Sequence, residues 1–261
     1  MNNRLTEKSY WDSVYLGRDG IVPVNLCGVA NKCYEEIYSI KKKIGIENKN
    51  VLEIGGGGSA WLAYLSRTHP DSTFTCLDYS EQGVAEIQSY ANENELRNLF
   101  ALNGDLFEAV DRCGKYDLVY SHGVAEHFSD LAQVLRAKAA YLDKAGRLLT
   151  VIPNMSGILG VLTKKMNREV YDLHVAHDLL SFQQGHKEAG LKIIESGYLC
   201  STNFGVLSSC VDVKYGIKWF LYVGLATVSR ILWAFERSVT KIPASRLFSP
   251  YIYVVAENDE L

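Results

Sequence analysis

A run of four consecutive glycines follows a short apolar segment and is the clearest candidate for a ligand-binding loop in this chain. Residues 51–54 are typical of a buried strand, and helical apolar spacing resumes at Ala60, after the glycines at 55–58. Glycine has no Cβ atom, so such a loop can turn sharply and bring its backbone N–H groups close to a ligand. We therefore expect a binding site where the strand ends, as in open α/β sheets.

One ligand class suggested by this loop is a dinucleotide. Gly55, Gly57 and Ala60 satisfy the loose Gly-x-Gly-x-x-Ala pattern of dinucleotide-binding loops, and Asp78 lies about the expected 20 residues beyond it. Glu53, two positions before the first glycine, is not part of that pattern. A second interpretation is therefore needed.

The segment Glu53-x-Gly55-x-Gly57-x-Ser59 resembles the nucleoside-binding loop of class I S-adenosylmethionine-dependent methyltransferases, where an acid at this position is typical. The resemblance extends motif by motif over residues 51–152. It implies a three-layer, Rossmann-like α/β fold with a mostly parallel seven-stranded sheet and an antiparallel last strand. It also implies S-adenosyl-L-methionine as the cofactor. An NAD(P)-dependent oxidoreductase and a scaffold protein that binds without turnover stay open as alternatives.

The resemblance also implies which residues contact the cofactor. Asp78 ends an expected strand at the position where the family's acid accepts from both ribose hydroxyls, which suits a carboxylate because it only accepts. Asp105 is expected to accept from the adenine amine, with a helix N-cap as its alternative role. The expected cofactor-binding residues are Tyr10, Trp11, Glu53, Gly55, Gly57, Asp78, Tyr79, Asp105, Leu106 and Ser121.

Three histidines are candidates for the catalytic base. Residues 124–128 (Val-Ala-Glu-His-Phe) resemble the V-x-E-H segment that opens a helix and faces the transferring methyl group in these methyltransferases. His127 is a candidate base for an acceptor hydroxyl because the ordinary imidazole pKa is near neutrality, although it could instead only shape the pocket. His174 and His177 follow the fifth expected strand and are equal candidates. They lack a recognisable set of carboxylate or thiol neighbours, so we expect no metal.

The elements that must position these residues alternate along the chain. Apolar runs predict five strands, followed by two more near the end, at residues 51–54, 73–78, 99–102, 116–120, 146–152, 191–198 and 251–256. Helical spacing predicts helices between them, including one from Phe128 to Leu142, and two before the sheet at residues 5–15 and 29–44. Such alternation predicts βαβ units and a parallel sheet.

We expect a single domain with three parts. These are a helical cap over residues 1–48, a cofactor-binding core over 49–153 and an acceptor-side segment over 154–261. The 261 residues are 48% hydrophobic and carry a net charge of −3, which gives no electrostatic footprint for nucleic acid. The six cysteines show no C-x-x-C spacing and the first residues are polar, so we expect a cytoplasmic protein without a signal peptide. The overall expectation is a biosynthetic enzyme that methylates a hydroxyl of a small molecule or glycan precursor.

Residues 217–235 form a long apolar run. Lys218 and Arg230 leave 11 uncharged residues between them, which we expect to be too short to span a membrane. A helix that is apolar all round must be covered by its own sheet, a second copy of the chain or a membrane surface. We favour the first two because the basic residues around it are few. Peripheral contact at the inner face of the membrane, serving a lipid-linked acceptor, is the third possibility.

Overall fold

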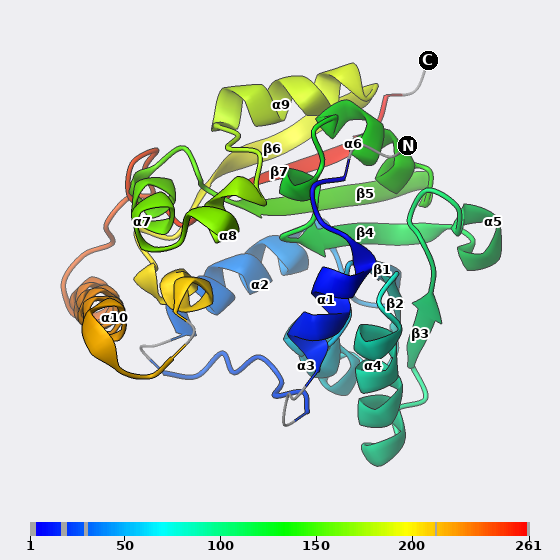
Figure 1. The fold of residues 1–261 in the computed structure, drawn as a ribbon. Helices are drawn as coiled ribbons and strands as arrows, with labels where there is room; N and C mark the ends of the chain where they lie inside the picture. Colours follow the sequence, from blue (N-terminus) through cyan, green and yellow to red (C-terminus); the bar gives the residue numbers. More distant parts are fainter. Residues whose placement is uncertain (1–3, 17–19, 29–30, 212, 260–261) are drawn as a thin grey trace.

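The computed structural model describes residues 4–16, 20–28, 31–211 and 213–259. In this part of the chain seven strands form one sheet in the order β3-β2-β1-β4-β5-β7-β6 (Figure 1). Their bounds are β1 Asn50–Ile54, β2 Thr73–Asp78, β3 Leu99–Asn103, β4 Tyr116–His122, β5 Leu142–Pro153, β6 Leu191–Leu199 and β7 Tyr251–Asn258. Strand β7 is antiparallel to β5 and β6, whereas the pairs from β3 through β5 are parallel. The expected fold class is confirmed.

Helices cover both faces of the sheet, which gives three layers (Figure 1). On one face lie α2 (Lys32–Ile44), α3 (Ala60–Thr68) and α4 (Glu81–Glu93), and on the other α5 (Val110–Cys113), α6 (Leu131–Ala139) and α9 (Leu179–Glu188). Alternate strand residues point to opposite faces, so Val51 joins the first core and Leu52 the second. Both side chains are fully buried.

The strand order reverses between β1 and β4, and this reversal determines where a ligand can bind. From β1 the chain proceeds to β2 and β3 on one side, and then crosses to β4 on the other. The carboxyl ends of β1 and β4 therefore flank a crevice at a topological switch point, where such sheets bind their ligands. Helix α1 (Lys8–Tyr15) contributes Trp11 and Tyr15 to the wall of this crevice.

Two local predictions need correction. Residues 124–128 do not open a helix, because Ala125–His127 is a single 3-10 turn, η2, and α6 begins only at Leu131. Asp130 caps α6 by accepting from the Gln133 N–H. Leu142 belongs to β5 instead of a helix, since it pairs with Tyr116 of β4. Val29, predicted at the start of α2, lies outside the described residues.

The segment after β5 contains elements that the sequence did not predict. Helices α7 (Ile158–Met166) and α8 (Arg168–Asp172) follow β5, and the 3-10 helix η3 (Phe204–Cys210) follows β6. They share a small third core in which Leu159, Phe204 and Leu207 are buried. This third core lies beside the sheet and supports the last long helix.

Helix α10 (Gly216–Ser238) is the apolar run, and the sheet does not cover it (Figure 1). One side of the helix packs on η3, and only 11% of its most apolar 18 residues are buried. The prediction that its own sheet covers it is therefore wrong. By length and composition this helix could also cross a membrane, so the expectation that Lys218 and Arg230 make the run too short is not supported.

Candidate functional site

The glycine loop has the geometry that a tight strand-to-helix turn requires. Gly55 has φ +73°, and its N–H donates to the Leu77 carbonyl at 2.8 Å. A Cβ at Gly55 would lie 2.4 Å from the Val124 Cγ2 atom. Glycine is needed here for both the positive φ and the close approach of the neighbouring loop.

Glu53 supports the loop from below and does not line the crevice. Its buried Oε2 accepts from the Ser59 hydroxyl at 2.6 Å and from the Tyr120 hydroxyl at 2.7 Å. Ser59 in turn caps α3 by accepting from two backbone N–H groups. Burial raises the pKa of Glu53, while the charge of the buried Lys41 and these two hydrogen bonds lower it. The side chain therefore positions the glycine loop.

Asp78 holds the middle of the same loop. Its Oδ2 accepts from the Gly57 N–H at 2.9 Å, and its Oδ1 accepts from the Ser80 N–H at 2.8 Å. Burial raises the pKa of this carboxyl, and the two backbone hydrogen bonds act in the opposite direction. A hydrogen bond from the Tyr15 side chain lowers it further. Because a carboxylate has about four acceptor positions, one remains for a ligand.

Gly57→Ala is expected to lower the free energy of unfolding by about 1–3 kcal/mol, as overpacking of a tight site typically does. The added Cβ would lie 2.8 Å from the Asp78 Oδ2 atom and 2.9 Å from the Gly83 Cα atom, and the backbone at Gly83 cannot move aside cheaply. Urea unfolding measures the change. Gly224→Ala is the control, because no atom lies within 4 Å of a Cβ there and alanine favours a helix. Equal stability of the two variants would contradict the close-packing argument.

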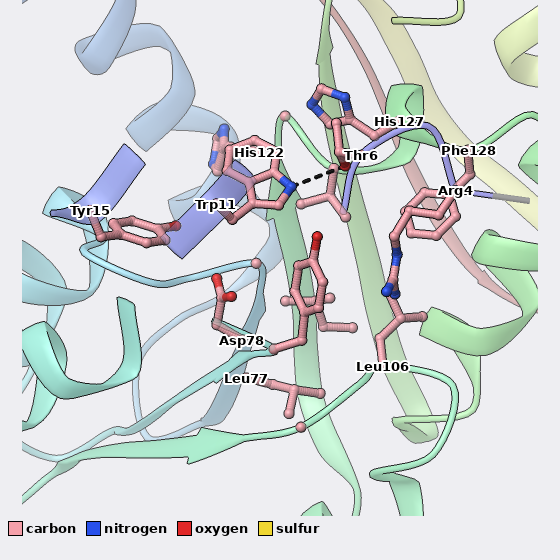
Figure 2. A pocket seen from close by; sticks show the side chains of 16 residues that line it. Arg4, Thr6, Trp11, Tyr15, Leu77, Asp78, Leu106, His122, His127 and Phe128 are labelled. Atoms are coloured by element: carbon pink, nitrogen blue, oxygen red, sulfur yellow. Dashed lines mark hydrogen bonds between the residues drawn. The ribbon is translucent and has the colours of Figure 1, made fainter. Parts of the chain in front are cut away.

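A first cavity opens above the loop, with an empty volume of about 750 Å³ including open solvent. Figure 2 shows the Asp78 carboxylate facing it, with Trp11 and Tyr15 of α1 on one side and Arg4 and Phe128 on the other. The indole N–H of Trp11 donates to the Thr6 hydroxyl at 3.0 Å, which fixes the ring. The predicted residues that line this cavity are Trp11, Gly55, Asp78, Tyr79, Leu106 and His127.

Other predicted cofactor residues lie outside the lining. Tyr10 is partly exposed and packs edge-on against Trp11. Ser121 is fully buried, and its hydroxyl accepts from the Lys138 ammonium at 2.7 Å. Gly57 meets Asp78 through its N–H. These three residues therefore support the site without lining the first cavity.

Asp105 is engaged by a residue that the sequence analysis missed. Arg4 forms an ion pair with the Asp105 carboxylate at 3.0 Å and lies over the Tyr79 ring, 4.4 Å from its centre. The other Asp105 oxygen accepts from the Phe107 N–H. A ligand amine at Asp105 would therefore share this carboxylate with Arg4. Nothing in the local sequence signals this, because Arg4 reaches the site through an isolated bridge to Phe128.

A second cavity adjoins the first. Trp11, His122, Gly123 and His127 line both, and the second is otherwise walled mostly by apolar residues of β5, α7 and η3. Glu126 and His174 complete its polar part. His122 was not predicted as a site residue, although its place at the end of β4 could have suggested it.

The protonation of His127 follows from its surroundings. Its Nδ1 lies 2.7 Å from the Leu173 carbonyl, which can only accept, so Nδ1 carries the proton and Nε2 keeps a lone pair. His174 has the same arrangement with the Val170 carbonyl at 2.7 Å. Burial lowers the pKa of His127 to about 4 and also lowers the pKa of His174. His127 is therefore neutral near pH 7.

Glu126 lies beside the two histidines. Burial raises the pKa of Glu126 to about 7, and its Oε2 has no hydrogen-bond partner among the described residues. Ligand atoms of Glu126, His127 and His174 lie within 4.8 Å of one another, a spacing that could hold a cation. The sequence did not indicate this group, because His174 lies far along the chain. The expectation that the chain holds no metal stays a prediction.

His177 is the predicted catalytic residue that the structure does not bring to either cavity. Its backbone N–H donates to the Val175 carbonyl, and its ring lies near Phe182 of α9. It is thus separated from the pair formed by His127 and His174, whose ring centres are 4.7 Å apart. Of the three candidates, only His127 lines both cavities.

Comparison with known sequences points to one enzyme class. Residues 52–148 match the family model described as a methyltransferase domain. Over 168 residues the chain is 24% identical to the protein-lysine N-methyltransferase EFM4 of Saccharomyces cerevisiae, covering 60% of this chain and 73% of the yeast protein.

Solved structures share the fold over nearly the whole chain. A chain from the complex between the Haloferax volcanii methyltransferase activator Trm112 and a candidate methyltransferase gives a TM-score of 0.62 at 15% identity, covering 98% of this chain and 97% of that one. Magnesium protoporphyrin IX methyltransferase of Synechocystis, solved with S-adenosylhomocysteine bound, gives 0.56 at 16% identity, covering 96% and 93%. At these identities the likeness establishes the fold alone.

Proposed function

Because the chain is a class I S-adenosylmethionine-dependent methyltransferase, we propose that it methylates a hydroxyl group of a small molecule or of a glycan precursor. The observation that carries this proposal is the junction of the two cavities at His127, which lines both. A donor in the first cavity and an acceptor in the second would meet beside an imidazole whose Nε2 lone pair is available.

The first cavity suits the donor in this proposal. Gly55 and Asp78 line it, and Asp78 keeps an acceptor position beyond its bonds to two backbone N–H groups and to the Tyr15 side chain. Bound S-adenosylmethionine supplies a methyl group that its sulfonium has already activated. The protein therefore contributes mainly by aligning donor and acceptor, which can lower a barrier by several kcal/mol.

The second cavity supports a hydroxyl acceptor with an apolar body. His127 Nε2 would take the hydroxyl proton as the methyl group is transferred. Glu126 lies close enough to stabilise the resulting imidazolium. Met155, Leu159 and Val206 would contact the apolar part of the acceptor. In this proposal His174 assists His127, and His177 has no direct part.

The proposed enzyme acts in the cytoplasm in a biosynthetic pathway. Support for a reducing compartment comes from the cysteines, because no disulfide joins any of the six, all of which lie in the described part of the chain.

A methyl-transfer assay with the full chain tests this function. We expect S-adenosylhomocysteine to form only when hydroxylated acceptors are added from a panel of sugars, glycan precursors and phenols, with the methyl group on oxygen by mass spectrometry. Lysine peptides are the comparison, given the yeast relative. Methylation of those peptides alone would contradict the hydroxyl assignment. Tight binding of S-adenosylhomocysteine without turnover on a broad panel would favour a scaffold role.

A further inference from the structure

Exposed apolar side chains concentrate on one part of the molecule, residues 213–248, which we call the α10 surface. Of 21 large hydrophobic residues exposed in the described part of the chain, 12 lie there. They are Val213, Tyr215, Ile217, Phe220, Leu221, Val223, Val228, Ile231, Phe235, Val239, Leu247 and Phe248. Scattered exposed hydrophobics are normal, but a concentration of this size marks an interaction site.

The inner side of α10 fixes the helix on the domain. The Ser229 hydroxyl accepts from the Phe204 N–H at 2.9 Å, and the Trp233 indole donates to the Thr202 carbonyl at 2.9 Å. Glu236, one turn further along, forms a buried ion pair with Lys32 at 2.6 Å. These contacts hold α10 in one rotational position about its own axis.

The outer side of α10 is consequently presented to the surroundings. Ile217, Leu221, Val228, Ile231 and Phe235 recur at helical spacing along one side of the helix, which is turned away from the anchored residues. Ile217 is 89% exposed and Ile231 63%. With Phe220 at 72%, this side forms a continuous apolar strip.

The charges carried by the segment that holds the strip are almost all positive. Residues 213–250 contain six of the chain's 27 Lys and Arg but only one of its 30 Asp and Glu. That acid is Glu236, which is buried and paired with Lys32. Among the described residues, Lys214, Lys218, Arg230 and Lys241 have no ion pair. The chain as a whole carries −3, so the α10 surface is a basic region on an acidic protein.

We propose that the α10 surface docks on an anionic membrane, with the apolar strip among the lipid chains and the basic residues at the headgroups. A second copy of the chain fits less well. A two-fold interface would set this surface against itself, so Lys218 and Arg230 would meet only further basic residues. From the sequence we favoured cover by the chain's own sheet or by a second copy. The exposure of the strip, beside which Lys218 and Arg230 form no ion pair with any described residue, reverses that order.

The helix lies along the membrane surface in this arrangement and does not cross it. Spanning would require α10 to leave the domain, which would break the ion pair between Glu236 and Lys32 and the hydrogen bonds of Ser229 and Trp233. A carboxylate in the hydrocarbon region is costly. The anchored stripe therefore favours peripheral contact, although the helix is long enough to span.

Docking would place the second cavity beside the membrane. The acceptor class that follows from this position rests on the proposed function. The 3-10 helix η3 lies between the two features, because α10 packs on it while its Val206 and Ser209 line the cavity. An amphiphilic acceptor could then keep its apolar part toward the lipid and present a hydroxyl to His127. The acceptor class is therefore a lipid or a lipid-linked precursor.

Vesicle co-sedimentation of the full chain tests the docking. We expect binding to vesicles of phosphatidylglycerol and phosphatidylcholine, weaker binding to phosphatidylcholine alone, and loss of affinity at high salt. Phe220→Ser with Ile231→Ser should weaken binding at least about tenfold, because both side chains would enter the lipid. Phe100→Ser with Ile194→Ser, two exposed residues on the opposite edge strands β3 and β6, is the matched control and should bind like the native chain.

The charged contribution is tested separately with Lys218→Glu and Arg230→Glu, which should weaken binding only to the anionic vesicles. Light scattering reports the oligomeric state. A dimer that dissociates in the Phe220 and Ile231 variant, without vesicle binding by the native chain, would overturn the proposal in favour of a second copy. A native chain that binds no vesicles at low salt would also overturn it.

Calorimetry with S-adenosylhomocysteine distinguishes a failure of membrane docking from a failure of the proposed methyltransferase function. The Phe220 and Ile231 variant should bind this product as the native chain does, because neither residue lines a cavity. Vesicle binding together with turnover only on water-soluble acceptors would retain the docking and remove the amphiphilic acceptor. Turnover on water-soluble acceptors without any vesicle binding would retain the methyltransferase function alone.

Discussion

Asp78→Asn is expected to weaken the binding of S-adenosylhomocysteine by roughly 10- to 150-fold, which corresponds to about 1.5–3 kcal/mol for hydrogen bonds to a charged group. The native carboxylate accepts from the Gly57 and Ser80 N–H groups and faces the first cavity. The amide of asparagine has nearly the same shape but replaces one acceptor by a donor. It cannot satisfy both backbone groups, the Tyr15 side chain and a ligand hydroxyl together.

Calorimetry measures this affinity, and thermal unfolding confirms that the variant is folded at the temperature of the calorimetry. Asp117→Asn is the matched control. Its carboxylate also accepts from a backbone N–H, that of Asn50 at 2.9 Å, and from Lys49, but it lies near the start of β4 and away from both cavities. If Asp78→Asn bound the product as tightly as Asp117→Asn, Asp78 would not be the ribose acceptor.

The parts of this site that the sequence predicted are those set by short stretches of chain. The glycine loop and Asp78 follow directly from strands whose apolar pattern is continuous, and strand ends of a parallel sheet meet at one edge. The antiparallel β7 was predicted from the family resemblance and is confirmed. Local turn chemistry was not predicted, because α6, which Asp130 caps, begins three residues after the expected helix start at Phe128.

The parts that the sequence did not predict depend on contacts between distant segments. Arg4 reaches Asp105 across about 100 residues of chain, and His174 comes to lie against His127 only through the segment after β5. Neither contact leaves a periodic signal. The exposure of α10 was missed for a similar reason, since an apolar helix pattern does not tell whether a sheet, a lipid or another chain covers it.

His127→Gln is expected to lower turnover roughly 100-fold or more, because a general base typically contributes 10²–10⁴-fold. Glutamine keeps a polar group of similar size but cannot accept a proton at neutral pH. The affinity for S-adenosylhomocysteine should change little. His186→Gln is the matched control, since His186 is equally buried and its Nδ1 meets the Phe182 carbonyl at 2.8 Å, yet it lines neither cavity.

The pH profile of kcat/KM gives an independent measure of the same role. Burial lowers the pKa of His127 to about 4, so the folded enzyme keeps this imidazole neutral well below pH 6.5. The base is then available at neutral pH and lost only as the pH falls toward 4, which places the acid limb about two units below that of an ordinary histidine. Circular dichroism at each pH separates this limb from acid unfolding. A limb near pH 7 that is present in both the native chain and His127→Gln would report Glu126, whose pKa burial raises to about 7. Near-normal turnover of His127→Gln would leave alignment alone as the catalytic contribution.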